Sequence, residues 1–554
     1  MRTRIINLTN KVIERYSKEL NAQHLEYDIE VPKQETQGDI SVNIAFKLSR
    51  IVRKAPLAIA QELLPCYEEC VKEDKELDNV IDRIEVAKPG FINFFFTPAI
   101  ATLILKEINA HPQEYGTNNY GKGEKVLIEF VSANPTGPLT IAHGRQACIG
   151  DTLAAIMKTC GYDVVKEYYL NDGGNQIRML GLSVFVRYLE KAGRTEPFPE
   201  EGYQGVYITD IAEKIHSEKG DTYAQKDITD EKTLQFFSQH AADLILSDIK
   251  EDLKTISVVF DNYYPESSLY EKKIQAALAE LDEKNFCYEK EGAVWLKTTE
   301  KGDDKDRVLV KSDKTYTYLV PDIAYHKDKF ERGFTTLINL LGPDHHGYIK
   351  RLKASVDAIG YNQDKLHVMI VQLTTLYKDG APFRMSTRKG TFVSLRELIK
   401  EVGADATRLF FLMKLTESHL DFDLKLAKEK SQDNPVYYFQ YAFARISSIL
   451  RLAEIKKFSE ADLSLLVEPE EMKLVKLMAD YSNILITASR QFEPYRLVDY
   501  LRELAASFHK FYNKCRVIGD DKALSKARLY LVSCVREVIG SGLSLLGVSQ
   551  PERM

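Results

Sequence analysis

The sequence predicts a multidomain α/β protein, with a doubly wound parallel sheet in the middle, an α+β domain before it and an all-α bundle after it. Three observations predict this order. At 554 residues the chain is long enough for about two to four domains with substantial cores. From about residue 120 strand and helix patterns alternate, which is typical of parallel sheets. From about residue 426 only helical spacing remains.

The first domain is expected over residues 1–115. The strand pattern "GFINFFF" at 90–96 lies between two prolines, and the Gly/Asn-rich link "EYGTNNYGKGEK" then marks a domain boundary. At the start of the chain, five apolar residues at helical spacing predict an amphipathic helix: Ile5, Leu8, Val12, Tyr16 and Leu20.

The middle domain is expected over residues 120–425. A strand at 125–131, a helix opening near His143 and a second strand at 164–170 form a βαβ pattern, which predicts a Rossmann-like doubly wound sheet. A charge-rich stretch at about 185–300 is interpreted as an insertion, after which the βα pattern resumes. Residues 426–554 are expected to form the helical bundle.

Composition limits the class of protein. The hydrophobic content of 44% and charged content of 28% are typical of globular proteins. The net charge of −6 argues against indiscriminate nucleic-acid binding, although a local basic face remains compatible with it. Charges run through the first 20 residues, and no apolar run approaches the roughly 18 residues of a membrane helix. We therefore expect a cytoplasmic protein with reduced thiols and no membrane partner.

The stretch "EFVSANPTGPLTIAHGR" at 129–145 runs from a strand through a tight turn into a helix. A helix that begins just past a parallel strand points free N–H groups and a positive dipole end at the crevice, which suits a nucleotide phosphate. His143 at the helix start can donate a hydrogen bond to such a phosphate. The alternative is a loop histidine whose hydrogen bonds are made by backbone groups, and the tight turn alone does not decide between them.

Several blocks of the sequence resemble one family. "NPTGPLTIAHGRQACIGD" resembles the signature region of class I aminoacyl-tRNA synthetases, whose helix-opening motif His-x-Gly-His here reads Thr140-Ile141-Ala142-His143. Six further blocks, spread over essentially the whole chain in the family's order, resemble arginyl-tRNA synthetases: "EYYLNDGGNQI", "YTYLVPDIAYHKDKFERG", "GPDHHGYIKRLKA", "RMSTRKG", "NPVYYFQYAFARISSIL" and "LLGVSQPERM".

The resemblance implies ATP-dependent activation of L-arginine to arginyl-adenylate, followed by transfer to the terminal ribose of tRNA(Arg). It makes the middle domain catalytic, with Mg²⁺ accompanying ATP as substrate. A guanidinium needs a carboxylate in a partly dry, planar site. By similarity the arginine-binding residues are Glu129, Asn134, Tyr318, Asp322 and His346. Taken alone, Asp322 would also fit a helix N-cap.

The resemblance assigns His143 and Thr140 to catalysis and places Gly342, Asp344 and His345 beside ATP. Because no third or fourth ligand stands at zinc-like spacing from the paired histidines, no zinc site is expected.

The second class I signature, Lys-Met-Ser-Lys-Ser, here reads Arg384-Met385-Ser386-Thr387-Arg388. Met385 and Ser386 are expected at ATP. Since Thr387 replaces the second lysine, Arg388 and Lys389 are the candidates to supply positive charge over the leaving pyrophosphate. The alternative is a solvated basic loop.

The resemblance makes the first domain a reader of the tRNA elbow and the bundle a binder of the anticodon. Relatives use an aromatic and an amide of the strand at 90–96, which correspond here to Phe91 and Asn93. In "FHKFYNKCR", stacking and cationic groups suit single-stranded RNA, although core packing explains the aromatics equally well. The candidates in this segment are Lys510, Tyr512, Lys514 and Arg516.

Two other functions compete with an active arginine–tRNA ligase. A non-catalytic RNA-binding relative is supported by the altered signature residues Thr140, Ala142 and Thr387. A nucleotidyl transferase acting on a small molecule would share the α/β scaffold, but it would not explain the terminal bundle. We expect a monomer.

Overall fold

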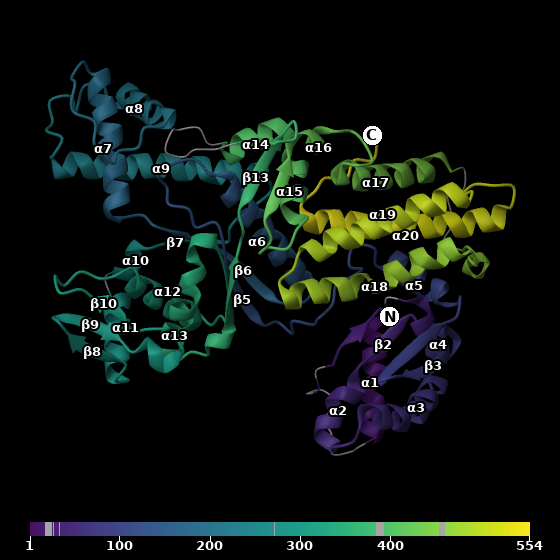
Figure 1. Cartoon of the computed structure of the whole chain (residues 1–554). Coiled ribbons are helices and arrows are strands. Elements are labelled where there is room, and N and C mark those ends of the chain that lie inside the picture. The colour runs from purple at the N-terminus through teal and green to yellow at the C-terminus, as the bar shows by residue number, and fades with distance from the viewer. Residues whose placement is uncertain (17–24, 26, 33, 271, 384–392, 454–459) are drawn as a thin grey trace.

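The computed structural model describes residues 1–16, 25, 27–32, 34–270, 272–383, 393–453 and 460–554. An α+β part at the N-terminus, a central α/β part and a C-terminal helical part are distinct in Figure 1. The helical part lies between the other two in this view. All seven cysteines are free thiols.

A five-stranded parallel sheet forms the centre of the α/β part. Its strand order is β12-β11-β5-β6-β7, and every pairing in it is parallel. The order therefore reverses between β5 and β11, which confirms the doubly wound sheet. The strands are β5 Lys125–Glu129, β6 Asp163–Leu170, β7 Asn262–Pro265, β11 Thr336–Leu341 and β12 Leu366–Ile370.

The two faces of this sheet bury different cores, because side chains alternate along each strand. Ile128 packs in the core that includes Ile149 and Leu153 of helix α6, Ile141–Thr159. Leu127 packs in a separate core with residues of α13, Ile349–Ala358. Helix α12, Leu319–Glu331, lies on the same side as α13.

The range expected to be an insertion, about 185–300, is not wholly inserted. Its strand β7 pairs with β6 and forms the edge of the central sheet. The sequence predicts no strand there, because "NYYP" is only four residues long and lies among charge-rich helical segments. The helices that project from the sheet between β6 and β7 are α7 Gly174–Lys191, α8 Val206–Lys219 and α9 Glu231–Thr255.

Two small sheets complete the α/β part. One is antiparallel, with order β10-β9-β8, and the other has order β14-β13-β15. Their strands are β8 Cys287–Lys290, β9 Ala293–Leu296, β10 Arg307–Val310, β13 Thr374–Lys378, β14 Ala381–Pro382 and β15 Leu420–Asp423. The remaining helices are α10 Ser267–Tyr270, α11 Lys273–Glu283, α14 Leu395–Val402, α15 Ala404–Leu412 and α16 Leu424–Lys428.

The N-terminal part packs helices on an antiparallel sheet of order β1-β2-β4-β3. The predicted amphipathic helix is α1, and its Ile5, Leu8 and Val12 are buried; Leu20 lies outside the described residues. The elements are α1 Arg2–Tyr16, β1 Ile29–Glu30, β2 Ile40–Val42, α2 Ile44–Val52, α3 Pro56–Lys72, α4 Lys75–Val80, β3 Ile81–Ala87, β4 Phe91–Phe96 and α5 Ile100–Ala110.

Four long helices form the C-terminal part: α17 Pro435–Leu452, α18 Pro469–Gln491, α19 Tyr495–Lys514 and α20 Lys522–Leu546. Within the described chain, α20 alone has the length and composition to cross a membrane, with a mean hydropathy of 1.4 over its most apolar window. It contacts the other three helices, and 67% of that window is buried. It is therefore packed as the core helix of the bundle.

Arg408 of α15 joins the helical part to the α/β part. Its buried guanidinium donates to the carbonyls of Leu546 at 2.7 Å and Ile256 at 2.6 Å, and to Asp151 of α6 at 2.9 Å. The last turn of α20 is thus fixed against α6, the helix that carries His143 near its start.

Candidate active site

The sheet has its topological switch point between β5 and β11, and ligands of open α/β sheets bind at such a point. Glu129 ends β5, and Gly342 follows the end of β11. A side chain at Gly342 would approach Gln146 of α6 at 3.9 Å, so the loop after β11 lies beside the helix that follows β5. The sequence-predicted residues that follow these two strands therefore flank one crevice.

Helix α6 begins at Ile141, with Thr140 as its N-cap. The backbone N–H of Thr140 donates to Nδ1 of His143 at 3.2 Å. A neutral imidazole that accepts at Nδ1 carries its proton on Nε2. Burial lowers the pKa of His143 to about 4, so this neutral form holds at physiological pH. His143 is thus a neutral hydrogen-bond donor at a helix N-terminus.

The second signature lies outside the described residues, and with it Met385, Ser386, Arg388 and Lys389. The segment that follows it is described and lies against the turn before α6. The N–H of Leu395 donates to the carbonyl of Leu139 at 2.8 Å, and Ser394 forms a bridge with Thr140. The described segment that follows the second signature therefore meets the first signature at the start of α6.

Asp322 lies in the first turn of α12, whose N-cap is Tyr318, so the N-cap alternative for Asp322 is wrong. Its carboxylate accepts a hydrogen bond from the hydroxyl of Tyr348. Burial, together with the negative charges of Glu129 and Glu266, raises the pKa of Asp322 to about 7 against the lowering effect of the Tyr348 hydrogen bond. The carboxylates of Asp322, Glu129 and Glu266 therefore lie close enough to one another to interact.

Two other predicted residues lie in the same segments: Tyr318 is the N-cap of α12, and Asn134 follows β5. Tyr318 is 62% exposed, and its hydroxyl accepts from Arg351. Asn134, in the turn after β5, donates from Nδ2 to Gln176 of α7 at 2.6 Å. Tyr348, Arg351 and Gln176 were missed by sequence reasoning, because a polar residue on a helix or turn shows its partner only in the fold.

Asp344, His345 and His346 lie in a short 3-10 helix, Pro343–Tyr348, and their side chains are exposed. Among the described residues, no hydrogen bond joins His346 to Asp322, whereas Tyr348 makes one. In the part of the chain that the structure describes, no group of three or more His, Cys, Asp or Glu side chains is arranged to hold a metal ion.

A row of polar side chains crosses the sheet beneath α12. Asn339, Glu129, Glu167 and Asn262 are register partners on β11, β5, β6 and β7. Because partners in one register row face the same side, all four side chains point toward α12. Sequence reasoning found only Glu129, since strand register is not visible in the residues of one strand.

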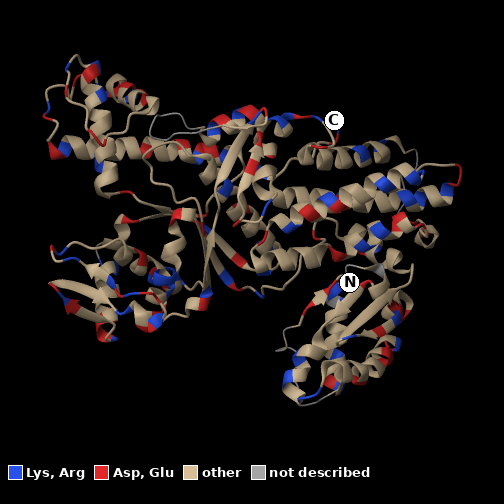
Figure 2. Ribbon diagram, viewed as in Figure 1, with Lys and Arg blue, Asp and Glu red and all other residues tan. Residues whose placement is uncertain are grey.

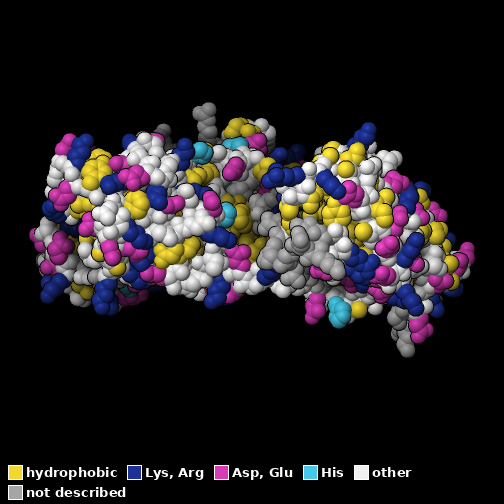
Figure 3. Space-filling view, turned by 90° about the horizontal axis from the view of Figure 1, so that it is seen from below, with side chains coloured by type: hydrophobic (Ala, Val, Ile, Leu, Met, Phe, Trp, Pro, Cys, Tyr) yellow, Lys and Arg dark blue, Asp and Glu magenta, His cyan; other side chains and the backbone are white. Residues whose placement is uncertain are grey.

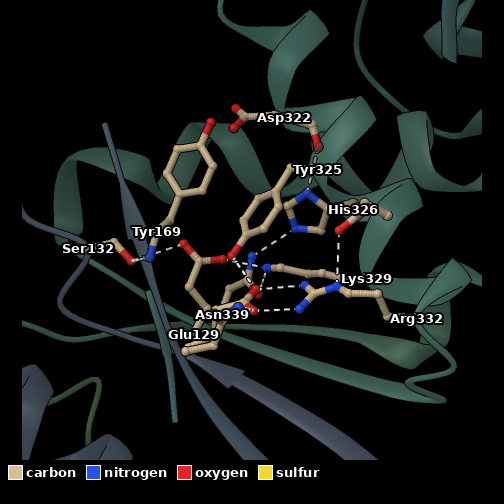
Figure 4. A network of polar contacts seen from close by, with 12 residues as sticks. Glu129, Ser132, Tyr169, Asp322, Tyr325, His326, Lys329, Arg332 and Asn339 are labelled. Carbon is tan, nitrogen blue, oxygen red and sulfur yellow. Dashed lines mark hydrogen bonds and ion pairs between the residues drawn. The ribbon is translucent and has the colours of Figure 1, made fainter. Parts of the chain in front are cut away.

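Side chains from α12, and from Arg332 at its C-terminal cap, form hydrogen bonds and ion pairs with this row (Figure 4). Lys329 donates from Nζ to Glu129 Oε2 at 2.5 Å, and Arg332 binds both oxygens of Glu167 at 2.6 and 2.8 Å. Tyr325 also donates to Glu167, at 2.7 Å. Burial alone would raise the pKa of Glu167, but these donors and the charge of Lys329 bring it below its usual value.

In the N-terminal part, Phe91 and Asn93 share the side of β4 opposite to the buried Ile92 and Phe94. Asn93 is only 5% exposed, and its Oδ1 accepts from Ser41 of β2 at 2.7 Å. Its amide oxygen therefore has a partner within the protein.

Lys510 of α19 and Arg516 just after this helix are exposed. Tyr512 accepts from Arg445 at 2.7 Å, and Lys514 pairs with Glu470 at 2.7 Å. Basic and acidic side chains are interspersed over the helical part in Figure 2 and over the face seen in Figure 3. An RNA contact on these faces would use individual cations between acidic neighbours.

Comparison with known proteins matches three family models in chain order. Residues 3–96 match the arginyl tRNA synthetase N terminal domain, and residues 105–419 match the catalytic domain of class I tRNA synthetases (R). Residues 439–554 match the DALR anticodon binding domain.

Full-length relatives agree with these matches. A protein of Syntrophotalea carbinolica named arginine–tRNA ligase is 47% identical over 535 residues, which cover 96% of this chain and 95% of that protein. An arginine–tRNA ligase of Listeria monocytogenes serotype 4b is 46% identical over 95% of this chain and 94% of its own length. The crystal structure of a putative arginyl-tRNA synthetase from Campylobacter jejuni superposes with a TM-score of 0.77 at 36% identity, covering 83% of this chain and all of that one.

Proposed function

The chain belongs to the arginyl-tRNA synthetase family, and from that premise we propose which of its residues bind and activate arginine. The protein is a class I arginine–tRNA ligase that charges tRNA with arginine using ATP. Its near-half identity to relatives of that name favours this activity over a non-catalytic RNA-binding role.

Arginine binds between β5 and α12. The carboxylate of Asp322 pairs with the guanidinium, and the carboxylate of Glu129 pairs with the α-ammonium. Tyr318, Asn134 and His346 line the pocket. The observation that carries this proposal is the position of two carboxylates at the crevice: Glu129 ends β5, and Asp322 lies in the first turn of α12, the helix that contacts this strand through Lys329. Two carboxylates make the crevice complementary to a ligand with two cationic groups, and burial together with the neighbouring negative charges raises the pKa of Asp322.

Activation joins the arginine carboxylate to the α-phosphorus of ATP. The carboxylate oxygen forms a bond to that phosphorus as the bond to the pyrophosphate oxygen breaks, and pyrophosphate leaves. His143 donates from Nε2 to a phosphate oxygen beside the N-terminus of α6, with Thr140 as its partner. Gly342, Asp344 and His345 border the nucleotide. Any Mg²⁺ enters with ATP, because carboxylates and phosphates are its preferred ligands.

Four residues of the second signature complete this part of the proposal. Met385 and Ser386 contact ATP, and Arg388 and Lys389 place positive charge over the departing pyrophosphate. Two contacts support this placement: Ser394 with Thr140, and Leu395 with Leu139. They bring the residues that follow the second signature to the turn before α6.

The terminal ribose of tRNA(Arg) then attacks the arginyl carbonyl, and AMP leaves. We assign residues 1–115 to the tRNA elbow, with Phe91 and Asn93 on a base, and residues 120–425 to catalysis. Residues 426–554 bind the anticodon through four candidates on or just after α19: Lys510, Tyr512, Lys514 and Arg516. We further propose that the protein acts as a monomer in the cytoplasm.

Charging of bulk tRNA with labelled arginine and ATP tests the activity, with lysine as the control amino acid. Arginine but not lysine is expected on the tRNA. Failure with folded protein would refute the proposal. The arginine pocket is tested separately by the Asp322 variant described in the Discussion.

A further inference from the structure

Lys329 is completely buried, and its ammonium is bound on three sides. Its Nζ donates to Glu129 Oε2 at 2.5 Å and to Asn339 Oδ1 at 3.3 Å, and it lies 4.0 Å from the centre of the Tyr325 ring. The orientation of the Asn339 amide agrees with this contact, because its Nδ2 lies 2.8 Å from Nε2 of His326 while its Oδ1 faces the lysine. This lysine contacts a residue of the proposed pocket without lining the pocket itself.

The other oxygen of Glu129 is held from the opposite side. Ser132 donates from its hydroxyl to Glu129 Oε1 at 3.2 Å, and the same hydroxyl accepts from the N–H of Tyr169 at 3.0 Å. The turn that presents Ser132 is strained, since Val131 and Ser132 have φ of +66° and +40°. A β-branched residue in the left-handed region is a rare conformation that persists only when its surroundings enforce it.

Each carboxylate oxygen accepts about two hydrogen bonds, so one partner on each leaves Glu129 with free acceptor positions. The directions of these positions are set by Lys329 and Ser132. We infer that Lys329 is a positioning residue for substrate selection, which aims the free acceptor positions of Glu129 at the α-ammonium of arginine. This inference rests on the proposed role of Glu129.

The same helix relates the two ends of the pocket. Asp322 lies seven residues before Lys329, two turns earlier on one face of α12 and about 10 Å along its axis. Lys329 on Glu129 and Arg332 on Glu167 fix this helix to the sheet through two ion pairs. The separation of Glu129 from Asp322 is therefore set by the helix that carries Lys329, which favours a ligand whose two cations are spaced as in arginine.

Lys329→Met removes the charge while keeping a long side chain. Its control, Lys327→Met, removes a lysine of the same helix that pairs with Glu280 at 3.0 Å, away from the crevice. The site is probed with three ligands: arginine, agmatine, which keeps the amine and lacks the carboxylate, and 5-guanidinopentanoate, which lacks the amine. The KM for arginine is measured in the activation reaction, and the two analogues are measured as competitive inhibitors of that reaction.

Lys329→Met is expected to weaken the binding of arginine and of agmatine by about tenfold or more, the scale of losing a supporting partner of a binding group. The binding of 5-guanidinopentanoate should weaken by less than about twofold. Lys327→Met should change none of them. Equal loss of all three ligands, or no loss, would overturn the inference.

Two further variants keep the test decisive. If Lys329→Met does not fold, Ser132→Ala releases the other oxygen of Glu129 and should give the same order of ligands with a smaller loss. Glu129→Gln should also discriminate by the amine. If Glu129→Gln discriminates and neither positioning variant does, the inference fails and the proposed pocket stands. If Glu129→Gln does not discriminate, the proposed role of Glu129 itself fails.

Discussion

The backbone N–H of Thr140 donates to Nδ1 of His143 at 3.2 Å, and this bond determines which nitrogen of the histidine can donate outward. The hydroxyl of Thr140 lies 3.3 Å from the same nitrogen. Thr140, which occupies the place of the family's first signature histidine, therefore contacts the histidine that remains. The altered motif places one neutral donor, Nε2–H of His143, at the N-terminus of α6.

His143→Ala should slow arginine activation by about 10²-fold or more, the scale of removing one preorganised donor from a transition state. Thr140→Ala should cost distinctly less, because the backbone N–H that orients the ring is kept. The measurement is single-turnover adenylate formation with saturating arginine, ATP and tRNA. His143→Gln, which retains a side-chain N–H, serves as the conservative comparison and should recover part of the rate. Equal damage from Thr140→Ala and His143→Ala would contradict this ranking.

Asp322→Asn keeps the shape of the pocket and removes the charge opposite the guanidinium. The loss of a charge-assisted hydrogen bond at a desolvated site should lower kcat/KM for arginine by the equivalent of about 2 to 4 kcal/mol. The KM for ATP should change little. Glu331→Gln, an exposed carboxylate on the same helix, is the control and should leave all constants unchanged. An unaltered kcat/KM for arginine in Asp322→Asn would place the guanidinium elsewhere.

The raised pKa of Asp322 predicts a pH dependence of arginine binding. Below about pH 7 the free enzyme carries a protonated Asp322, which cannot pair with a guanidinium. The value of kcat/KM for arginine should therefore rise with pH through about 7, and binding near pH 6 should release a proton. His143, whose pKa is lowered to about 4, does not contribute to this limb.

Calorimetry in two buffers of different ionisation enthalpy measures the proton release. Tyr348→Phe removes the hydrogen bond that lowers the pKa of Asp322, so the acid limb should move to higher pH in that variant. A limb that stays in place in both Tyr348→Phe and Asp322→Asn would assign the titration to another group.

The periodicity of the chain was sufficient to predict the centre of the fold. The apolar run that became β5 and the repeat that became α6 are long enough to show their type, and their order implies a parallel sheet. Strand β7 was not predicted, because four residues rich in tyrosine carry no alternation that distinguishes a strand from a loop.

The residues of the candidate site also fall into those that the sequence predicted and those that only the fold revealed. Residues within quoted blocks, such as Glu129 and Asp322, were predicted because the resemblance carried them. Lys329 and Arg332 were not predicted, although Lys329 stands on the same helix as Asp322 and Arg332 is the C-cap of that helix. A basic residue in a charged helical segment is ordinarily solvated. The burial of Lys329 and the contact of Arg332 with Glu167 depend on the register between α12 and three strands, which is a property of tertiary packing.

The hydrogen bond between Ser41 and Asn93 allows the RNA-reading role of Asn93 to be separated from a structural one. Asn93→Ala should weaken tRNA charging by about 1 to 3 kcal/mol in kcat/KM for tRNA, the scale of a lost base-specific contact, while leaving KM for arginine unchanged. Ser41→Ala removes the same internal hydrogen bond at 2.7 Å and keeps the amide. If Asn93 reads a base, Ser41→Ala should charge close to normally, and both variants should lose similar thermal stability. Should the two variants charge tRNA equally well at equal melting temperature, the amide serves the β2–β4 pairing alone, and Phe91 remains as the candidate of this strand.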